Sequence, residues 1–363
     1  DPSLRKLSPD ETAALPFDQQ KIVEAFGATM ENSAGTGATI VAQLWRIAVA
    51  GLREIVYRLP KRAGGKRFVD LLTREVQLEA DGKATTDRQI LFGMLILQRQ
   101  KDIKATSDIC RLINRRMDDW ERGDLKSLLV EALRSDKEHA DGQGPMDTKQ
   151  CFRVFTHLIM HNKLREAVRF VTDRKGGGPL DLNCTAKGFD KEGKEADLDH
   201  TNYESVQSKH PPPAPADPSA FASPEGGVLP HVEPLEATAA HVEKVAKQLK
   251  GGAGPSGLDG EQWRCLLLDY GGSSVQLRTA VAALVRRHAN TLVPWQDLRA
   301  MLARRGVALD KKPGVRPIGV GECRQRIEAK VVTLIAGKDV QRVCGADQMC
   351  AGTKAGIEGS VYD

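Results

Sequence analysis

The sequence predicts a mainly α-helical protein with one β-hairpin near its C-terminal end. Apolar residues recur at helical spacing through most of the 363 residues, and glycine and proline gather between those periodic segments. One pair of short apolar runs flanks a Pro-Gly turn. With 40% hydrophobic and 28% charged residues, the chain has the balance of an ordinary folded protein, and its length accommodates two or three domains.

Residues 1–175 are expected to form an α-helical N-terminal domain. The segment from Ile40 to Leu59 carries apolar residues at helical spacing with few breakers. Thr106-Ser107-Asp108 offers N-cap side chains to a later helix. Further helices are predicted near 67–80, 87–101, 107–134 and 148–172.

Residues 176–236 are predicted to be a proline-rich linker. Gly176-Gly177-Gly178-Pro179 stops the preceding helix, and a charged polar stretch follows. The run from Lys209 to Pro215 favours polyproline II, which has no internal hydrogen bonds and builds no core. We expect this segment to lie over a surface or to bridge two domains.

Residues 237–363 are predicted to be a second unit. Two short apolar runs within 307–320 flank Lys-Lys-Pro-Gly, and Pro313-Gly314 suits positions i+1 and i+2 of a type II turn. Ser256 with Asp259 is positioned to cap the helix that starts at 260. Helices are expected over 237–249, 260–269, 274–290 and 322–343.

Composition and charge limit the classes of partner. The formal net charge is only +5, yet residues 299–330 contain nine Lys or Arg and three Asp or Glu. Aromatic residues are 5%, which argues against an extended aromatic platform for bases. Seven scattered cysteines without a CxxC motif favour a reduced intracellular protein, cytoplasmic or nuclear. No apolar run reaches transmembrane length and no signal peptide is visible, so no membrane partner is expected.

Three segments carry a resemblance to a known family. They are GGAGPSGLDGEQWRCLL (251–267), LDKKPGVRPIGVGE (309–322) and CGADQMCAGTKAGIEGSVYD (344–363). In this order they resemble the fingers region of reverse transcriptases of retrotransposons, and residues upstream of 251 look like the region that precedes the polymerase in such retroelements. The resemblance implies the start of a right-hand polymerase fold, with residues 237–363 as an incomplete, mainly helical fingers subdomain.

The resemblance implies RNA-directed DNA synthesis, with an RNA template, a DNA primer and deoxynucleotides as partners. Cationic side chains on a mobile hairpin neutralise phosphate, arginine through bidentate contact and lysine as a point charge. Arg316 is thereby the candidate for triphosphate contact, and Lys311 and Lys312 for phosphate or template. The nucleotide- or template-binding candidates are Lys311, Lys312, Arg316, Arg324, Arg326, Lys330, Gln348 and Lys354.

No catalytic or metal-binding residue is assigned in this chain. Polymerase chemistry needs two metal ions held by carboxylates, and in the family the first such aspartate lies beyond the segment where this sequence stops. Mg²⁺ is therefore expected only for a complete polymerase, and the fragment alone is expected to be inactive. Gln325 and Glu328 depart from the family pattern, and Glu328 is spaced to pair with Arg324. The alternatives are a non-catalytic nucleic-acid-binding retroelement remnant and a helical scaffold protein.

Four other motifs have simpler structural interpretations. Residues 252–257 match GxGxxG, but a helix precedes them and Pro255 interrupts them, so we expect a turn. His157 and His161 share a helix face without the HExxH glutamate, and we expect packed or half-exposed histidines. Residues 117–119 (Met-Asp-Asp) are interpreted as a charged helix face, and the basic residues of 61–67 as a solvated loop.

Overall fold

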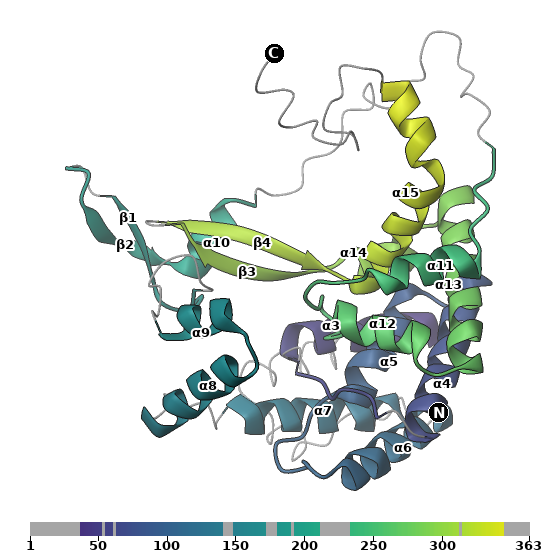
Figure 1. The fold of residues 1–363 in the computed structure, drawn as a ribbon, viewed down its shortest axis with the longest axis horizontal. Helices are drawn as coiled ribbons and strands as arrows, with labels where there is room; N and C mark the ends of the chain where they lie inside the picture. Colours follow the sequence, from purple (N-terminus) through teal and green to yellow (C-terminus); the bar gives the residue numbers. More distant parts are fainter. Residues whose placement is uncertain are drawn as a thin grey trace. The chain divides into compact units, whose positions relative to one another are not determined.

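The computed structural model describes residues 37–52, 55–60, 63–140, 148–171, 180–189, 192–210, 233–311 and 314–344. The predicted mainly α-helical class is confirmed (Figure 1). The helices are α3 (Gly37–Gly51), α4 (Ala63–Ala80), α5 (Thr86–Leu97), α6 (Thr106–Arg122), α7 (Leu125–Ala140), α8 (Thr148–Met160), α9 (Leu164–Val171), α10 (Asn202–Ser208), α11 (Ala239–Lys247), α12 (Gly260–Leu268), α13 (Gly272–Asn290), α14 (Trp295–Leu302) and α15 (Cys323–Cys344). The strands are β1 (Thr185–Phe189), β2 (Glu195–Thr201), β3 (Arg304–Asp310) and β4 (Val315–Gly321). No helix in these ranges combines the length and apolar character that crossing a membrane requires.

The chain folds into two compact units, and their boundaries differ from the predicted domains. Unit 1 comprises 1–141, 233–304 and 321–363, and unit 2 comprises 142–232 and 305–320. The predicted division into residues 1–175 and 237–363 differs from these units, because apolar helix faces from both segments bury each other. Buried side chains between Val41 and Leu133 and between Ala237 and Val331 form one hydrophobic core.

Unit 1 is built around α4 and α13, which lie side by side (Figure 1). The Phe68 ring on α4 stacks on the Phe92 ring of α5 with centroids 5.0 Å apart, and Trp120 meets Phe92 edge-on at 5.1 Å. Such aromatic pairs fix relative helix positions beyond what area burial provides. Ala48, Phe68, Leu72, Leu95, Leu267 and Leu277 are among its fully buried side chains.

Several predicted helices end earlier or start differently than their patterns suggested. The first one ends at Gly51 because residues 55–57 pair with another segment: Tyr57 N–H donates to the Leu97 carbonyl at 2.8 Å. The 107–134 pattern divides at Gly123, whose φ of 82° suits glycine, and the 148–172 pattern divides before α9. The predicted cap on α6 is also wrong, since Ala105 is its N-cap and the Ala105 methyl side chain accepts no hydrogen bond from the first helical turn.

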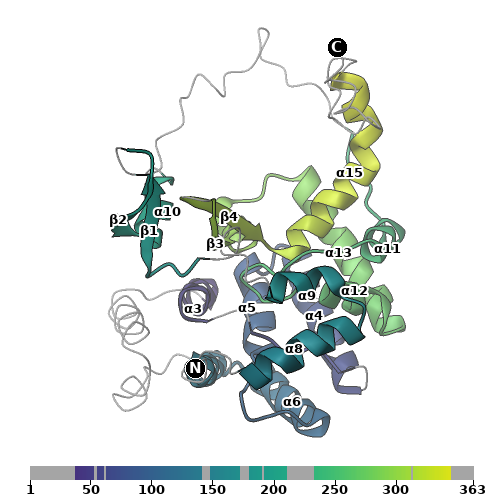
Figure 2. The same cartoon turned by 60° about the vertical axis from the view of Figure 1, so that its left-hand side comes forward.

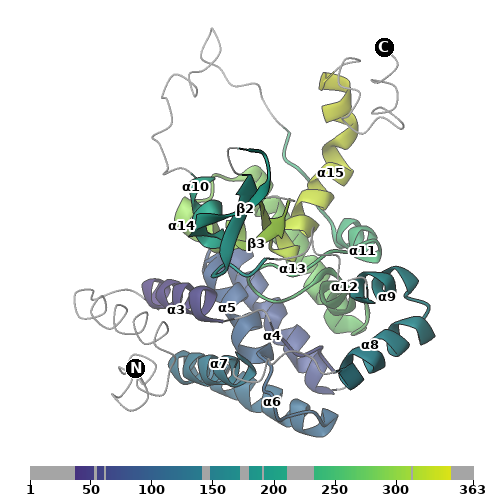
Figure 3. The same cartoon turned by 90° about the vertical axis from the view of Figure 1, so that its left-hand side faces the viewer.

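Unit 2 contains structure inside the predicted linker. β1 and β2 form an antiparallel hairpin with α10 beside it (Figure 2), so the structure contains a second hairpin in addition to the expected one. A Thr201–Glu204 capping box starts α10. The prediction failed here because both strands are short and only Ala186 is buried in them, which leaves almost no apolar alternation to detect. α8 and α9 form a helical hairpin in the same unit (Figure 3).

The hairpin predicted within 307–320 is confirmed as β3 and β4. Lys311 N–H donates to the Gly314 carbonyl at 2.9 Å, which closes the hairpin, and Gly314 has a φ of 113°. That left-handed conformation suits glycine because it has no Cβ. Lys312 and Pro313, the turn between them, lie outside the described residues.

Candidate nucleic-acid interface

The β3–β4 hairpin presents unpaired positive charge. Lys311 and Arg316 are both exposed, and neither forms an ion pair in the part of the chain that the structure describes. Lys209, at the end of α10, donates through Nζ to the Val315 carbonyl and adds a third cation beside β4. Sequence reasoning missed Lys209 because it belongs to the run assigned to the linker; its position next to a proline run gave no signal of a strand partner.

The hairpin is anchored within unit 2 by a few buried contacts. Val315 and Ala308 are 2% and 3% exposed, so one face of the ribbon is covered while Arg316 points to solvent. The Leu180 N–H donates to the Ala308 carbonyl at 2.8 Å. Asn202 of α10 donates to the Asp181 carbonyl, also at 2.8 Å, which ties that segment to the helix. Because alternate strand residues face opposite sides, burial of Val315 leaves Arg316 outward.

After the hairpin, Glu322 fixes the glycine-rich loop, which we define as residues 248–259 between α11 and α12. Glu322 is 2% exposed, and its two carboxylate oxygens accept hydrogen bonds from the Ser256 N–H and hydroxyl, both at 2.7 Å. Burial raises the pKa of Glu322, and the two bonds from Ser256 act in the opposite direction. The first and second segments of the family resemblance are therefore in direct contact.

Glycines allow this loop to approach the start of α15. A Cβ on Gly254 would lie 2.7 Å from the backbone nitrogen of Glu322, a distance that no side chain tolerates. Gly251, with a φ of 113°, leaves space for the Arg326 guanidinium, which donates to the carbonyls of Gly252 and Lys250. Arg326 thus holds loop carbonyls, and its guanidinium is already engaged by protein.

Arg324, a predicted ligand-binding residue, is buried and paired instead. Its side chain is 1% exposed, and it binds the carboxylate of Glu79 on α4 through both terminal nitrogens, one at 2.5 Å and one at 2.9 Å. The expected pairing with Glu328 is present, with Nε and Oε1 3.6 Å apart. This turn of α15 faces the core, where Cys323 and Ile327 are 0% exposed. Arg324 is therefore inaccessible to a nucleotide or template from solvent.

A histidine completes the buried charge cluster. His288 on α13 lies between two carboxylates, with Nδ1 2.7 Å from Glu328 and Nε2 3.7 Å from Glu79. Three elements distant in sequence (α4, α13 and α15) meet at this cluster. It secures the base of α15, and only the Arg324–Glu328 pair within it followed from the residue pattern of a single helix.

The remaining predicted site residues lie elsewhere. Lys330 is exposed and lines a groove between α11 and α15. Gln348 and Lys354, like Lys312, lie outside the described residues. The structure therefore places Lys311 and Arg316 on one ribbon, with Arg324, Arg326 and Lys330 on α15.

The other motifs have structural roles in the described residues. Asp118 accepts from Arg67 at 2.6 Å, and Asp119 pairs with Arg115 and Arg122, so the Met-Asp-Asp carboxylates belong to a charged helix face. The His157 and His161 rings are 4.0 Å apart, and His161 Nδ1 lies 2.8 Å from the His157 carbonyl. No group of three His, Cys, Asp or Glu side chains within the described ranges could hold a metal ion.

Asp259 confirms the predicted cap on α12. Its carboxylate accepts from the Gln262 N–H at 2.8 Å, and the Gln262 side chain accepts from the Asp259 N–H at 3.0 Å. The GxGxxG segment of residues 252–257 is thus a loop between two helices. It lacks the preceding strand that a dinucleotide site requires.

No protein-family model, curated protein or solved structure matches this chain. An exposed cationic ribbon can bind phosphate groups by charge and hydrogen bonding, and arginine adds a bidentate geometry.

Proposed function

We propose that this chain contributes the nucleic-acid- and nucleotide-binding part of a retroelement-type RNA-directed DNA polymerase. The observation that supports it best is the β3–β4 ribbon, which presents Lys311 and Arg316 to solvent, with no ion pair to either side chain among the described residues. Its partners would be an RNA template, a DNA primer and the triphosphate of a deoxynucleotide. The contact between the glycine-rich loop and Glu322 adds support, because it joins two segments of the family resemblance.

The chemistry that the proposal assigns to this chain is charge neutralisation and positioning. Lys311 and Lys312 bind backbone phosphates as point charges, and the Arg316 fork binds two oxygens of a triphosphate. Arg324 and Arg326 act through structure, since they hold α15 and the glycine-rich loop. No catalytic residue is proposed here. Mg²⁺ would be held by the carboxylates of a complete polymerase active site, to which we assign no residue of this chain.

Salt-dependent binding tests the cationic ribbon. The probe is a fluorescent RNA–DNA hybrid, titrated by anisotropy against wild type and a Lys311→Gln, Lys312→Gln, Arg316→Gln variant. Each lost phosphate contact lowers the slope of log affinity against log salt by about 0.9, so we expect a fall of about 2 to 3. A matched control removes three exposed positive charges from unit 1: Lys66→Gln, Lys104→Gln and Arg134→Gln.

The control variant should keep most of the slope, because those charges lie off the ribbon. Equal slopes for wild type and the ribbon variant would contradict the role of the hairpin. Arg316→Lys then separates nucleotide binding from general charge. This variant should preserve the salt slope but bind a fluorescent deoxynucleoside triphosphate more weakly, since lysine cannot bind bidentately. Unchanged triphosphate affinity in Arg316→Lys would remove the polymerase assignment and leave the non-catalytic nucleic-acid-binding alternative.

The scaffold alternative has to be tested with the whole chain. Residues 37–133 share their core with residues 237–331, so a piece ending near 175 would expose side chains that are buried in unit 1. An absence of hybrid binding by the full chain, together with a stable protein complex, would favour that alternative.

A further inference from the structure

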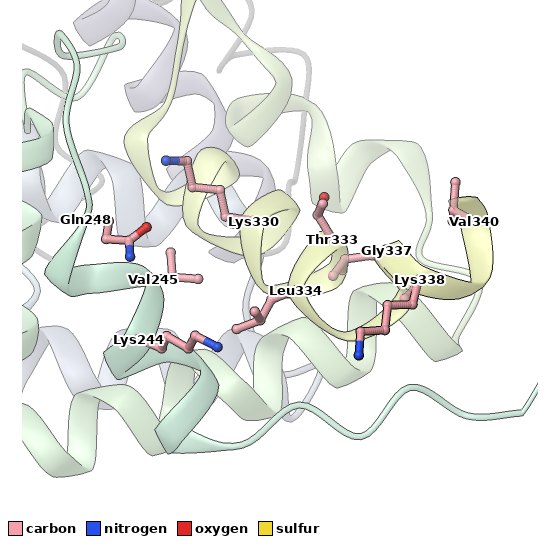
Figure 4. A pocket seen from close by; sticks show the side chains of 11 residues that line it. Lys244, Val245, Gln248, Lys330, Thr333, Leu334, Gly337, Lys338 and Val340 are labelled. Carbon is pink, nitrogen blue, oxygen red and sulfur yellow. The ribbon is translucent and has the colours of Figure 1, made fainter. Parts of the chain in front are cut away.

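The groove between α11 and α15 has an apolar floor and a basic rim. It encloses about 800 Å³ and lies entirely within unit 1. Val245, Val332 and Leu334 supply apolar surface, and Figure 4 shows Leu334 directed toward α11 between Lys330 and Lys338. Its volume falls within the range of ligand sites in proteins.

The rim carries three lysines without counter-charges. Lys244 on α11 and Lys330 and Lys338 on α15 are exposed, and no ion pair involves them among the described residues. Among the residues that the structure describes, no aspartate or glutamate lines the groove. The nearby acids are already paired, Glu243 with Lys247 and Arg278, and Asp339 with Arg342.

The apolar surface on α15 is exposed as well as grooved. Leu334 is 37% exposed and Val340 is 53% exposed, although both lie on a helix whose first turns are buried. Isolated exposed apolar residues are ordinary, but here they form one lining with Val245, which is 7% exposed. A partner that covers them gains hydrophobic burial, and one that also carries carboxylates neutralises the rim.

We propose that this groove binds an acidic amphipathic helix of a partner protein. The apolar face of such a helix inserts side chains at i, i+4 and i+7 over Leu334 and Val245, and its flanking carboxylates meet the lysines. A nucleic-acid strand fits less well, because the floor is apolar and no aromatic side chain of the described segments lines it for base stacking. The proposal is independent of the polymerase assignment, which rests on the β3–β4 ribbon.

A designed peptide tests the chemistry directly. The probe is a fluorescent helical peptide of about 15 residues, with leucines at i, i+4 and i+7 and glutamates on both sides of that stripe. Three ion pairs between rim lysines and peptide glutamates, at about 0.5 kcal/mol each, correspond to about a tenfold change in affinity. Lys244→Gln, Lys330→Gln, Lys338→Gln should therefore weaken the peptide about tenfold, and Leu334→Ser should weaken it further.

A charge exchange gives the sharpest result. The triple variant Lys244→Glu, Lys330→Glu, Lys338→Glu should no longer bind the acidic peptide. It should instead bind a peptide in which every glutamate is replaced by lysine. The control Lys66→Glu, Lys104→Glu, Arg134→Glu makes the same change in net charge on other exposed positions and should leave the preference for the acidic peptide intact. Circular dichroism confirms that each variant keeps its helical content.

Three results would overturn the proposal. One is no detectable binding of the acidic peptide by wild type, and another is equal binding by wild type and the groove variants. The third is binding of an oligouridine RNA to wild type that competes with the peptide and disappears in the lysine variants. That result would assign the groove to nucleic acid. The ribbon variant of Lys311, Lys312 and Arg316 should bind the peptide normally, so failure of the polymerase assignment would not affect this test.

Discussion

Glu79→Gln should destabilise unit 1 by about 3 kcal/mol because it leaves the buried Arg324 guanidinium without its main partner. Glu79 and Arg324 side chains are 2% and 1% exposed, and two hydrogen bonds join them. Hydrogen bonds to charged groups contribute about 1.5–3 kcal/mol each, and breaking one side of a buried ion pair costs about 3–5 kcal/mol. The remaining neighbour Glu328, 3.6 Å from Nε, keeps the expected loss at the lower end.

Urea unfolding followed by tryptophan fluorescence measures this loss selectively. All four tryptophans (45, 120, 263 and 295) belong to unit 1, so their emission reports the unfolding of that unit. With an m-value of about 3 kcal/mol/M, a loss of about 3 kcal/mol lowers the midpoint by about 1 M urea. Glu261→Gln is the matched control, because its pair with Arg58 is 2.9 Å long but both side chains are more than half exposed. It should cost less than about 1 kcal/mol.

The double variant Glu79→Met, Arg324→Met removes both members of the buried ion pair. Replacing both members of a buried ion pair by apolar side chains is often neutral or stabilising, so the double variant should be more stable than Glu79→Gln alone. Burial is the largest influence on the pKa of Glu79 and raises it, and the charge of Arg324 opposes that change. A loss below about 1 kcal/mol in Glu79→Gln would refute the reasoning, since it would mean that Glu79 is held protonated and that the pair is not ionic.

Two further predictions concern packing and pH. Gly254→Ala should destabilise unit 1 by about 1–3 kcal/mol in the same urea assay, because its Cβ would meet the Glu322 backbone at 2.7 Å. The control Gly272→Ala, with open space around it, should be neutral or slightly stabilising. Equal effects of the two substitutions would refute the close approach. Burial raises the pKa of Glu131, but the charge of Arg116 and bonds from Arg115 outweigh it and hold that pKa below its usual value. The stability that Glu131 contributes is therefore present above its unfolded pKa and lost as pH falls through the folded pKa. Glu131→Gln should consequently lose less stability than wild type on acidification below about pH 4.5. Parallel profiles of stability against pH for the two proteins would contradict this.

The amino-acid pattern alone determined the helical class and the principal hairpin. Apolar periodicity located α11, α12, α13 and α15 to within a few residues, because a helix face that is buried must repeat every three or four residues. Lys-Pro-Gly between two apolar runs located β3 and β4 for an equally local reason, the turn chemistry of proline and glycine. The Asp259 cap on α12 is of the same kind, since its partner Gln262 is three residues away.

Only the tertiary structure decided which charged residues are accessible. Arg316 and Arg324 look equivalent in a one-dimensional pattern, yet Arg316 lies on the outer face of a ribbon and Arg324 is buried against Glu79, 245 residues away. Lys209 was assigned to a linker and lies beside β4. Long-range pairings of this kind depend on how helix faces pack, and that information is distributed over the whole core.

The division of the chain was likewise set by packing and not by composition. The proline-rich stretch suggested a boundary between two separate helical domains, but apolar faces on both sides of it close over a single core. Linker composition determines that a segment lacks a core of its own, and it says nothing about whether the flanking helices bury one another. The sequence by itself therefore determined the helical class, the helices α11, α12, α13 and α15 and the cationic turn. The tertiary structure decided how the elements group, because burial of apolar area is a property of the assembled helices and of no single segment.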